Sequence, residues 1–303
     1  MHRTILLTLC IVCFVLSSAV SQAKKEKKGS LVAKGAELQQ VASDYTFTEG
    51  PAVDEKGNVY FTDQPNNRIL KWSTDGTVSV FMEDAGRANG LYFDNEGNLI
   101  ACADAKNELW KIDQDKNVSV LIDNFEGKKL NGPNDLWVSP NGGIYLTDPF
   151  YKRDYWDHSE PEIESQNVYY LAPGAKALTL AADNLKQPNG IVGSPDGKTL
   201  YVADIGDSKT YAYQINDDGS LSDRRLFVEM GSDGMTLDSK GNLYLTGKAG
   251  VTVFNPQGEQ IDQIPINENW TANVCFGGKN QKKLFITAMK SLYTIDMKAK
   301  GAR

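Results

Sequence analysis

Short runs of alternating apolar and polar residues, separated by turns rich in Gly, Asn and Pro, make up most of the chain. The pattern is clearest near the middle. There residues 136–139 predict a strand, residues 140–143 (Pro-Asn-Gly-Gly) a turn, and residues 144–147 the return strand of a β-hairpin. Asn134 precedes the first strand and Asp148 follows the second. Because a hairpin brings its open ends together, we expect both side chains on one rim.

This hairpin recurs at a spacing of about 40 to 55 residues, which is typical of propeller blades. Five copies have a glycine in the turn, and a sixth, weaker copy spans residues 274–287. A second pair of strands follows each hairpin, and no segment shows the apolar spacing of a helix. The repeats predict an all-β fold, a six-bladed β-propeller with four antiparallel strands per blade. The turn glycines are Gly57, Gly97, Gly142, Gly197 and Gly241.

Residues 33–303 are predicted to form this propeller as one domain. Residues 41–45 (Val-Ala-Ser-Asp-Tyr) lie ahead of the first hairpin and have no hairpin of their own. We predict that they supply the outer strand of the last blade, because closing the ring removes exposed sheet edges.

The first 23 residues have the features of a secretory signal peptide. They combine a positive charge at Arg3, an apolar run over residues 5–20, and small residues before the cleavage point. An uncleaved membrane anchor is the alternative, but the run is short for a span, which needs roughly 20 apolar residues. We therefore predict a secreted or periplasmic protein with no membrane association after cleavage. Residues 24–32 are predicted to form a basic, disordered tail.

Charge and cysteine content narrow the picture further. A net charge of −7 argues against binding to nucleic acid. Outside the N-terminal segment the only cysteines are Cys102 and Cys275, in repeats two and six. Repeat one lies between them in a closed ring, so we predict two small buried side chains and no disulfide. Nothing in the sequence indicates an obligate protein partner.

A residue with a side-chain oxygen stands eight positions before each turn glycine, and we call these the rim residues. Four of the return strands also end at an aspartate. Closing the ring directs both sets toward the mouth of the central channel. Oxygen ligands without thiolate or imidazole suit a hard cation, Ca²⁺ before Mg²⁺ or Mn²⁺. The rim residues are Glu49, Asn89, Asn134, Asn189 and Asp233, with Asn273 as the match in the sixth copy, and the strand-end aspartates are Asp63, Asp104, Asp148 and Asp204.

Each of these residues also has a simpler explanation, because an Asp or Asn before a strand often caps a turn. We expect Asp63 and Asp104 to be structural and to tie neighbouring blades through backbone hydrogen bonds. Histidine is almost absent, with only His158 outside the N-terminal segment. This excludes a histidine-ligated zinc site, and a Ser-His-Asp triad would have to rely on that one residue.

The third repeat carries a long loop, residues 150–166, on the predicted rim. Long loops in compact domains are often lids or binding loops. Three of its aromatic residues are expected to pack on a substrate or on a neighbouring loop, although a plain surface insertion would also explain the length. We predict that the loop borders the site. The aromatic residues are Tyr151, Tyr155 and Trp156, and the predicted substrate contacts are Asn89, Asn134, Tyr155, Trp156 and His158.

Four stretches resemble the signature motifs of the SMP-30/gluconolactonase/luciferin-regenerating-enzyme-like family and occur in the same order. They are residues 48–51 (Thr-Glu-Gly-Pro), 131–136 (Asn-Gly-Pro-Asn-Asp-Leu), 188–191 (Pro-Asn-Gly-Ile) and 232–235 (Ser-Asp-Gly-Met). Residues 151–156 and 201–205 look like the bacterial gluconolactonase branch. Some sugar-lactone members carry an arginine two residues before the central Asn, where this chain has Gly132.

The resemblance implies a six-bladed propeller with a divalent cation, usually Ca²⁺, at the channel mouth. Mg²⁺, Mn²⁺ or Zn²⁺ would be the substitutes. By position, the metal ligands implied by the resemblance are Glu49, Asn134, Asn189 and Asp233. The implied activity is the hydrolysis of a small-molecule sugar lactone, such as gluconolactone, to the open-chain hydroxy acid.

The expected mechanism follows from such a site. The cation would polarise the lactone carbonyl and stabilise the developing oxyanion. Asp233 would be both ligand and general base toward water, with Asp148 or Asp204 as alternatives. Two other functions stay open because fold alone does not establish function. One is a related metal-dependent phosphotriesterase or esterase, and the other is a non-catalytic propeller that binds a partner.

Overall fold

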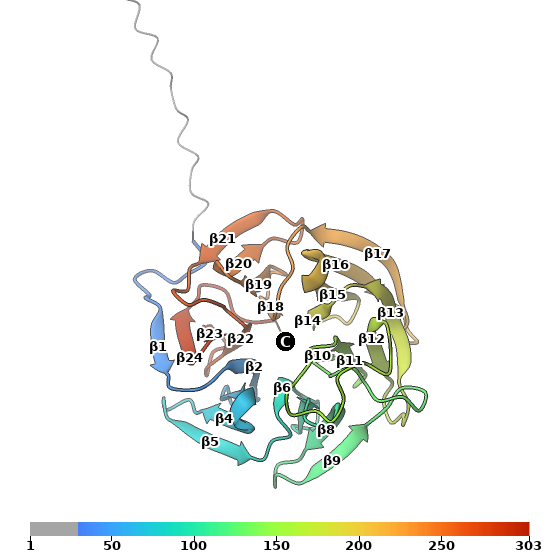
Figure 1. The fold of residues 1–303 in the computed structure, drawn as a ribbon. Coiled ribbons are helices and arrows are strands. Elements are labelled where there is room, and N and C mark those ends of the chain that lie inside the picture. The colour runs from blue at the N-terminus through green and yellow to red at the C-terminus, as the bar shows by residue number, and fades with distance from the viewer. Residues whose placement is uncertain (1–29, 303) are drawn as a thin grey trace, which may run out of the picture.

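Six four-stranded antiparallel sheets surround a central channel in the structure, a computed structural model that describes residues 30–302 (Figure 1). This arrangement confirms the six-bladed β-propeller. The described residues contain two short 3₁₀ turns, η1 (Gln64–Asn66) and η2 (Ile205–Asp207), and no α-helix. Over the same residues, no helix has the length and apolar character needed to span a membrane.

Each of the first five blades consists of four consecutive strands, the innermost first. Blade 1 comprises β2 (Thr48–Val53), β3 (Val59–Asp63), β4 (Arg68–Trp72) and β5 (Val78–Glu83), and blade 2 comprises β6 (Ala88–Phe93), β7 (Leu99–Ala103), β8 (Glu108–Ile112) and β9 (Val118–Ile122). Blade 3 comprises β10 (Leu136–Val138), β11 (Ile144–Asp148), β12 (Gln166–Leu171) and β13 (Thr179–Leu185). Blade 4 comprises β14 (Pro188–Gly193), β15 (Thr199–Asp204), β16 (Lys209–Ile215) and β17 (Leu221–Val228), and blade 5 comprises β18 (Met235–Leu237), β19 (Leu243–Gly247), β20 (Gly250–Phe254) and β21 (Gln260–Ile264).

Blade 6 joins the two ends of the described chain. It comprises β22 (Asn273–Gly277), β23 (Lys283–Ala288), β24 (Ser291–Asp296) and, as its outer strand, β1 (Gln39–Ala42). Strand β1 runs antiparallel to β24, with Gln39 opposite Thr294. The predicted closure is confirmed, although the strand begins two residues earlier than predicted. Asp44, with a φ of 70°, ends the extended conformation, and Tyr45 packs edge-on against Phe61 with ring centroids 5.5 Å apart.

The chain already contacts the propeller at residue 30, ahead of the boundary predicted at residue 33. The backbone N–H of Leu31 donates to Asp262 Oδ2 over 2.6 Å, and Val32 forms a β-bridge with Met297. Residues 30–32, which the sequence assigned to the tail, therefore lie against blades 5 and 6. The predicted signal peptide and the rest of the basic tail lie outside the described residues.

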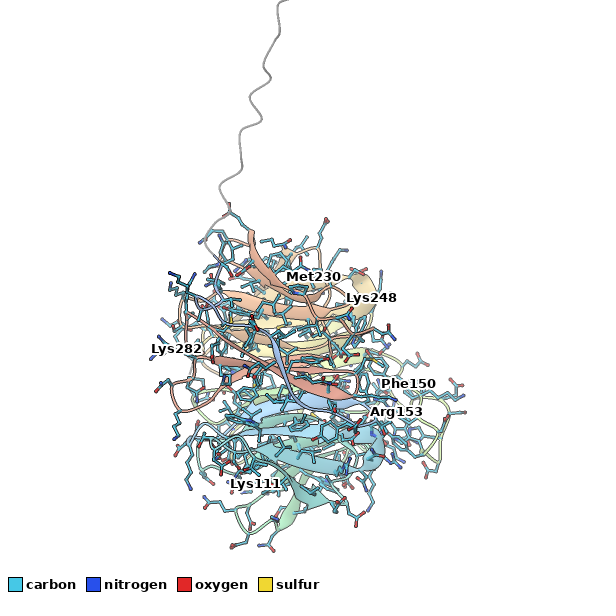
Figure 2. The ribbon with its side chains drawn as sticks, turned by 90° about the vertical axis from the view of Figure 1, so that its left-hand side faces the viewer. Lys111, Phe150, Arg153, Met230, Lys248 and Lys282 are labelled. Carbon is cyan, nitrogen blue, oxygen red and sulfur yellow. The ribbon has the colours of Figure 1, made fainter. Side chains whose placement is uncertain are left out.

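The disc has two distinct faces. One carries the turns of the inner hairpins, and we call it the turn face. The other carries the open ends of those hairpins, and we call it the rim face. Figure 2 shows the molecule from the side, with Lys282 from the β22–β23 turn at the left and Phe150 and Arg153 from the long loop of blade 3 on the right. The long loop therefore projects from the rim face.

Hydrophobic side chains fill the spaces between neighbouring blades. In the cluster between blades 1 and 2, Ile69 of β4 packs with Leu91 of β6 and Leu99 of β7, and all three are buried. Burial of such side chains is the main stabilising contribution in a fold of this kind. Cys102 and Cys275 are buried and form no disulfide, as predicted.

Threonines on the return strands of blades 1, 3 and 5 tie each of these blades to the next one at the channel. Thr62 Oγ1 donates to the carbonyl oxygen of Asn89 over 3.1 Å, and Thr147 Oγ1 donates to that of Asn189 over 2.7 Å. In both cases the acceptor is the rim residue of the following blade. This contact therefore marks the rim position of the following blade independently of any turn glycine.

The same contact corrects the rim residue of blade 6. Thr246 Oγ1 donates to the carbonyl oxygen of Ala272 over 2.7 Å, so Ala272 occupies the sixth rim position and the assignment of Asn273 is wrong by one residue. The reason is an extra pair, Gly277 with Lys283, at the turn end of the β22–β23 hairpin. Counting eight residues back from the turn therefore stops one residue short.

Glycine follows the rim residue in blades 1, 2, 4 and 5 because neighbouring inner strands nearly touch there. A Cβ on Gly50 would lie 2.0 Å from the carbonyl oxygen of Asn89, and one on Gly190 would lie 2.8 Å from that of Asp233. Gly50 also has a φ of 45°, a conformation that side chains disfavour. The backbones of neighbouring inner strands are therefore in contact at the channel mouth, and the rim side chains lie close together around it.

Removing the outer strand of blade 6 is predicted to destabilise the whole ring. A chain that starts at residue 45 should lose several kcal/mol of unfolding free energy. It exposes the edge of β24 and loses backbone hydrogen bonds worth roughly 0.5–1.5 kcal/mol each. Urea denaturation would measure the loss. A chain that starts at residue 30 keeps β1 and should match the full chain, and equal midpoints for the two truncations would contradict the prediction.

Candidate metal and active site

Three rim residues bring their side-chain oxygens together at the channel mouth. Glu49 lies on β2, Asn189 on β14, and Asp233 just before β18. Glu49 and Asn189 are buried and Asp233 is partly buried. Both Glu49 and Asn189 lie close enough to the carboxyl group of Asp233 to change its pKa. Residues from blades 1 and 4 and from the start of blade 5 therefore meet at one place on the rim face.

The two carboxyl groups of this cluster are poorly solvated and face each other. Burial, followed by the charge of Asp233, raises the pKa of Glu49 well above its usual value, while the N–H of Gly50 opposes the shift through a 2.9 Å bond to Oε2. Burial raises the pKa of Asp233 to about 6, against the hydrogen bond from Trp270. Trp270 donates Nε1 to Asp233 Oδ2 over 2.5 Å. A cation between these carboxylates would relieve their repulsion.

Asn189 supplies an oxygen that the protein does not satisfy. Its Nδ2 donates to the hydroxyl of Tyr151 over 2.9 Å, which fixes the orientation of the amide. Its Oδ1 is buried and has no hydrogen-bond partner among the described residues. A buried acceptor left in this state costs roughly 1–3 kcal/mol, so it calls for a ligand.

Asn134 stands at the same rim position in blade 3. Its N–H donates to the carbonyl oxygen of Thr147 over 2.9 Å, and its own carbonyl accepts from Gly90 N–H over 2.7 Å. Its buried side-chain amide makes no hydrogen bond to the described part of the chain. The position of Asn134 is thus fixed through its backbone alone, and its amide stays available.

Together these residues fit a hard divalent cation. Two carboxylates and two amides form an oxygen-only donor set, the type that Ca²⁺ prefers. Within residues 30–302, no three side chains of the types His, Cys, Asp and Glu gather in a way that could hold a metal. A metal at this mouth would therefore depend on the amides of Asn134 and Asn189 as well as on the carboxylates.

Asp148 and Asp204, considered above as general bases, bind backbone N–H groups. Asp148 Oδ1 accepts from Gly132 over 2.8 Å, and Oδ2 accepts from Asn131 over 2.9 Å. Asp204 makes the corresponding contacts in blade 4, and Asp63 makes them in blade 1, as expected for Asp63. All three aspartates are buried. Their carboxylates hold the segment that leads into the inner strand of the same blade.

Asp104 does not bind backbone N–H groups in this way, so the prediction that it does is wrong. Ala103, one residue earlier, takes the register position of the other strand-end aspartates. The buried carboxylate of Asp104 accepts instead from Gln64 Nε2 over 3.0 Å, from Arg153 Nε over 2.9 Å, and from the hydroxyl of Tyr155. Asp104 therefore joins blade 1 to the long loop of blade 3.

The long loop lies against the rim face, and its members have different roles. Tyr151 contacts a rim residue through its bond with Asn189. Tyr155 and Trp156 anchor the loop on blade 2, since Trp156 Nε1 also donates to the carbonyl oxygen of Asp104 over 2.7 Å. His158 stacks on the Trp156 ring, with centroids 4.9 Å apart. Three of the predicted substrate contacts therefore belong to the loop and its anchor on blade 2: Tyr155, Trp156 and His158.

Sequence reasoning missed several residues around the site. Asp135 follows Asn134 directly, and burial raises the pKa of its carboxyl group to about 7. Its Oδ1 accepts from Leu136 N–H over 2.9 Å, and the nearby side chain of Asn273 opposes the pKa shift. Because Asp135 lies in the second family motif, the sequence did contain a signal for it. The sequence contains no signal for Trp270, because Trp270 lies 37 residues from Asp233 in the chain.

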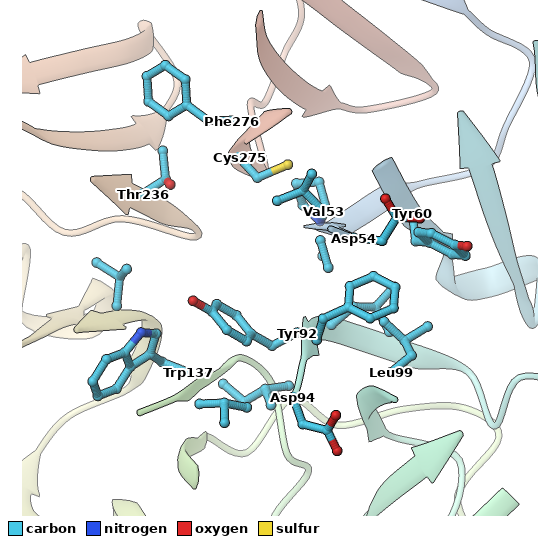
Figure 3. A pocket seen from close by; sticks show the side chains of 18 of the residues that line it. Val53, Asp54, Tyr60, Tyr92, Asp94, Leu99, Trp137, Thr236, Cys275 and Phe276 are labelled. Carbon is cyan, nitrogen blue, oxygen red and sulfur yellow. The ribbon is translucent and has the colours of Figure 1, made fainter. Parts of the chain in front are cut away.

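A cavity of about 710 Å³ occupies the central channel, and it opens on the turn face. Its lining includes Val53, Tyr92, Trp137 and Cys275, which Figure 3 shows around the channel. Asp135 and Asn273 also line this cavity, whereas the rim residues Glu49, Asn189 and Asp233 do not. The candidate site is therefore at the opposite mouth from this cavity.

The fold and this centre define the class of protein: a six-bladed β-propeller with carboxylates and amides gathered at one mouth of its channel. The chain belongs to the SMP-30/gluconolactonase/LRE-like family, whose conserved region matches residues 47–290. The family membership inferred from the four motifs is thereby confirmed.

Named relatives support this membership. Gluconolactonase from Zymomonas mobilis is 32% identical over 294 residues, covering 87% of this chain and 82% of that protein. The structure of a gluconolactonase from Xanthomonas campestris matches with a TM-score of 0.82 and 32% identity, over 88% of this chain and 91% of that one. A calcium-binding regucalcin from Agrobacterium tumefaciens shares the fold, with a TM-score of 0.73 and 17% identity over 88% and 95% of the two chains. The first two relatives are enzymes named for lactone hydrolysis.

The structural role of Asp148 predicts a specific pH effect. Burial raises its pKa to about 7 in the folded protein, above roughly 3.9 for an unfolded chain. The stability it contributes is therefore complete below about pH 4 and is lost as the pH rises to about 7. The unfolding free energy of the wild type should fall relative to that of Asp148→Asn over this range. Urea titrations at several pH values would measure it.

The matched control for this experiment is Asp217→Asn, because Asp217 is exposed. Its unfolding free energy should run parallel to that of the wild type at every pH. Parallel curves for the wild type and Asp148→Asn would contradict the prediction.

Proposed function

We propose that the protein is a divalent-cation-dependent lactonase that opens a sugar lactone, such as gluconolactone, to the hydroxy acid. The observation that carries the proposal is the unpaired Oδ1 of Asn189 beside the buried carboxyl groups of Glu49 and Asp233. This arrangement is unfavourable for the protein alone and suits a cation. The lactonase names of the relatives support the reaction class.

Glu49, Asn134, Asn189 and Asp233 would hold the ion, with Ca²⁺ the first choice for an oxygen-only set. Mg²⁺, Mn²⁺ or Zn²⁺ would be the substitutes. When bound, the ion supplies Lewis-acid polarisation of the lactone carbonyl and stabilisation of negative charge on its oxygen. Calcium binding by a protein of the same fold agrees with this choice.

Asp233 is the general base in this proposal. It would accept a proton as the oxygen of a water molecule bonds to the carbonyl carbon. The bond from that carbon to the ring oxygen then breaks, and the ring oxygen takes up a proton to become the hydroxyl of the product. The bond from Trp270 to Oδ2 keeps the carboxylate of Asp233 in one orientation. Asp148 and Asp204 are disfavoured as bases because backbone N–H groups occupy their carboxylates.

Two other functions compete at the same site. A metal-dependent phosphotriesterase or esterase would use the same ion on a different substrate. A non-catalytic propeller would have no use for the strained pair Glu49 and Asp233, whose repulsion costs stability in the absence of a cation. The lactonase is favoured because it accounts both for the site and for the lactonase relatives.

Removal of the metal tests the proposal most directly. The purified protein should hydrolyse glucono-1,5-lactone, lose that activity in excess chelator, and recover it when Ca²⁺ is added back. Proton release measured in weak buffer follows the reaction. Paraoxon and a simple aryl ester are assayed in parallel. Hydrolysis of paraoxon or of the aryl ester without hydrolysis of the lactone would favour the phosphotriesterase or esterase. Hydrolysis of none of the three substrates would favour the non-catalytic propeller.

Two substitutions separate the base from a pure ligand. Asp233→Asn keeps an oxygen donor but cannot accept a proton, so kcat at saturating Ca²⁺ should fall by roughly 10²- to 10⁴-fold. Glu49→Gln should instead raise the Ca²⁺ concentration needed for half activity, and excess Ca²⁺ should restore part of its rate. Calcium titrations of lactone hydrolysis for both variants, with Asp217→Asn as control, measure the difference. If saturating Ca²⁺ restores Asp233→Asn to the wild-type rate, Asp233 is a ligand only.

A further inference from the structure

We propose that this site selects lactones that carry a second, anionic group, either a carboxylate or a phosphate, and that Arg153 binds that group. The inference rests on the lactonase proposed above and adds the class of its substrate. It comes from an arginine that the long loop places beside the candidate metal centre, with most of its donors unused.

Arg153 is held at one end only. Its Nε donates to the buried carboxylate of Asp104 over 2.9 Å, and its guanidinium carbon lies 5.4 Å from the centroid of the Tyr151 ring. Its two terminal nitrogens make no hydrogen bond to the described residues. A guanidinium has five N–H donors, so four of them remain for a ligand. The side chain is 24% exposed, which leaves those donors accessible.

The same arginine borders the candidate metal centre. Tyr151, on whose ring the guanidinium rests, binds Asn189 through its hydroxyl. The charge of Arg153 also acts on Asp233, where it lowers the pKa. A lactone with its carbonyl at the four rim residues would thus have its far substituents near Arg153. The carboxylate of Asp104 fixes the guanidinium in this position before any ligand arrives, which limits the entropy lost on binding.

The balance of charge around Asp104 favours an anion. A second arginine, Arg87, lies with its guanidinium carbon 4.3 Å from the Tyr155 ring centroid, and its Nη1 donates to the carbonyl oxygen of Pro65 over 2.8 Å. Both arginines act electrostatically on Asp104. Two guanidinium groups therefore act on the carboxylate of Asp104, and the other carboxyl group nearby, that of Asp148, is occupied by backbone N–H groups. A divalent cation between Glu49 and Asp233 would offset the charges of these two carboxylates, and the buried carboxyl group of Asp135 is the other acidic group beside them.

The chemistry of the free donors narrows the ligand to a planar or tetrahedral oxyanion. An arginine presents parallel N–H groups that pair with two oxygens of a carboxylate or a phosphate. A sugar hydroxyl can use only one of these donors at a time. The structure therefore favours a lactone of an aldaric acid or of a phosphorylated aldonic acid over the neutral gluconolactone.

The test compares three lactones on the calcium-loaded full chain. Glucono-1,5-lactone is neutral, glucaro-1,4-lactone carries a free carboxylate, and 6-phosphoglucono-1,5-lactone carries a phosphate. The wild type should give a higher kcat/KM for at least one anionic lactone than for the neutral one. Arg153→Gln should reduce this anionic-to-neutral ratio by roughly 10- to 100-fold, since a hydrogen-bonded charge contributes about 1.5–3 kcal/mol and 1.4 kcal/mol is tenfold.

The matched control is Lys152→Gln, which removes the same charge from the adjacent, exposed residue of the same loop. Its ratio should stay within about twofold of the wild-type ratio. Arg153→Lys, which keeps the charge but loses the paired donors, should fall between the wild type and Arg153→Gln. Whether the carboxylate or the phosphate substrate is preferred identifies the natural anion.

Three results would overturn the inference. The first is a wild-type preference for the neutral lactone. The second is an equal loss for all three lactones in Arg153→Gln, because a residue that only anchors the loop would act on every substrate alike. The third is an equal change of ratio in Lys152→Gln, which would indicate long-range charge and no binding. Absence of hydrolysis for any lactone by the wild type is a different outcome, since it contradicts the proposed function itself.

Discussion

Contact between the backbones of neighbouring inner strands at the channel mouth is the constraint on which the rest of the structure depends. The strands approach so closely that a methyl group on Gly50 or Gly190 would overlap the next blade. Threonine hydroxyl groups reinforce the same contact, as Thr147 does with the carbonyl of Asn189. These contacts hold the backbone at the rim positions. The rim side chains are left to point where the six blades meet.

That arrangement explains why chemically similar residues take different roles. Asp233 and Asp148 are both aspartates at the open end of an inner hairpin, yet only Asp233 joins the cluster with Glu49 and Asn189. The carboxylate of Asp148 turns back onto the N–H groups of Asn131 and Gly132. The difference is one of position in the hairpin: the rim residue precedes the first strand, and the strand-end residue closes the second. The first position faces the axis and the second faces the incoming chain.

A shift of one residue in blade 2 has a comparable effect. Since Ala103 takes the place of a strand-end aspartate, the carboxylate of Asp104 is free of backbone N–H groups and available to the long loop. It binds Arg153 and Tyr155, and so it fixes the loop across the rim face. One register difference thereby converts a structural aspartate into the anchor of the long loop.

The sequence alone determined the architecture, because the hairpin pattern and its spacing are local properties that repeat six times. It also determined the rim residues of five blades, since a fixed count from a turn glycine follows the strand register. Only the tertiary structure decided the sixth rim position and the contacts between residues far apart in the chain. The extra pair in the β22–β23 hairpin moved the sixth rim position to Ala272, and the bonds from Trp270 to Asp233 and from Arg153 to Asp104 join residues 37 and 49 positions apart. Such contacts depend on how blades close around an axis, and that closure has no signature in any single repeat.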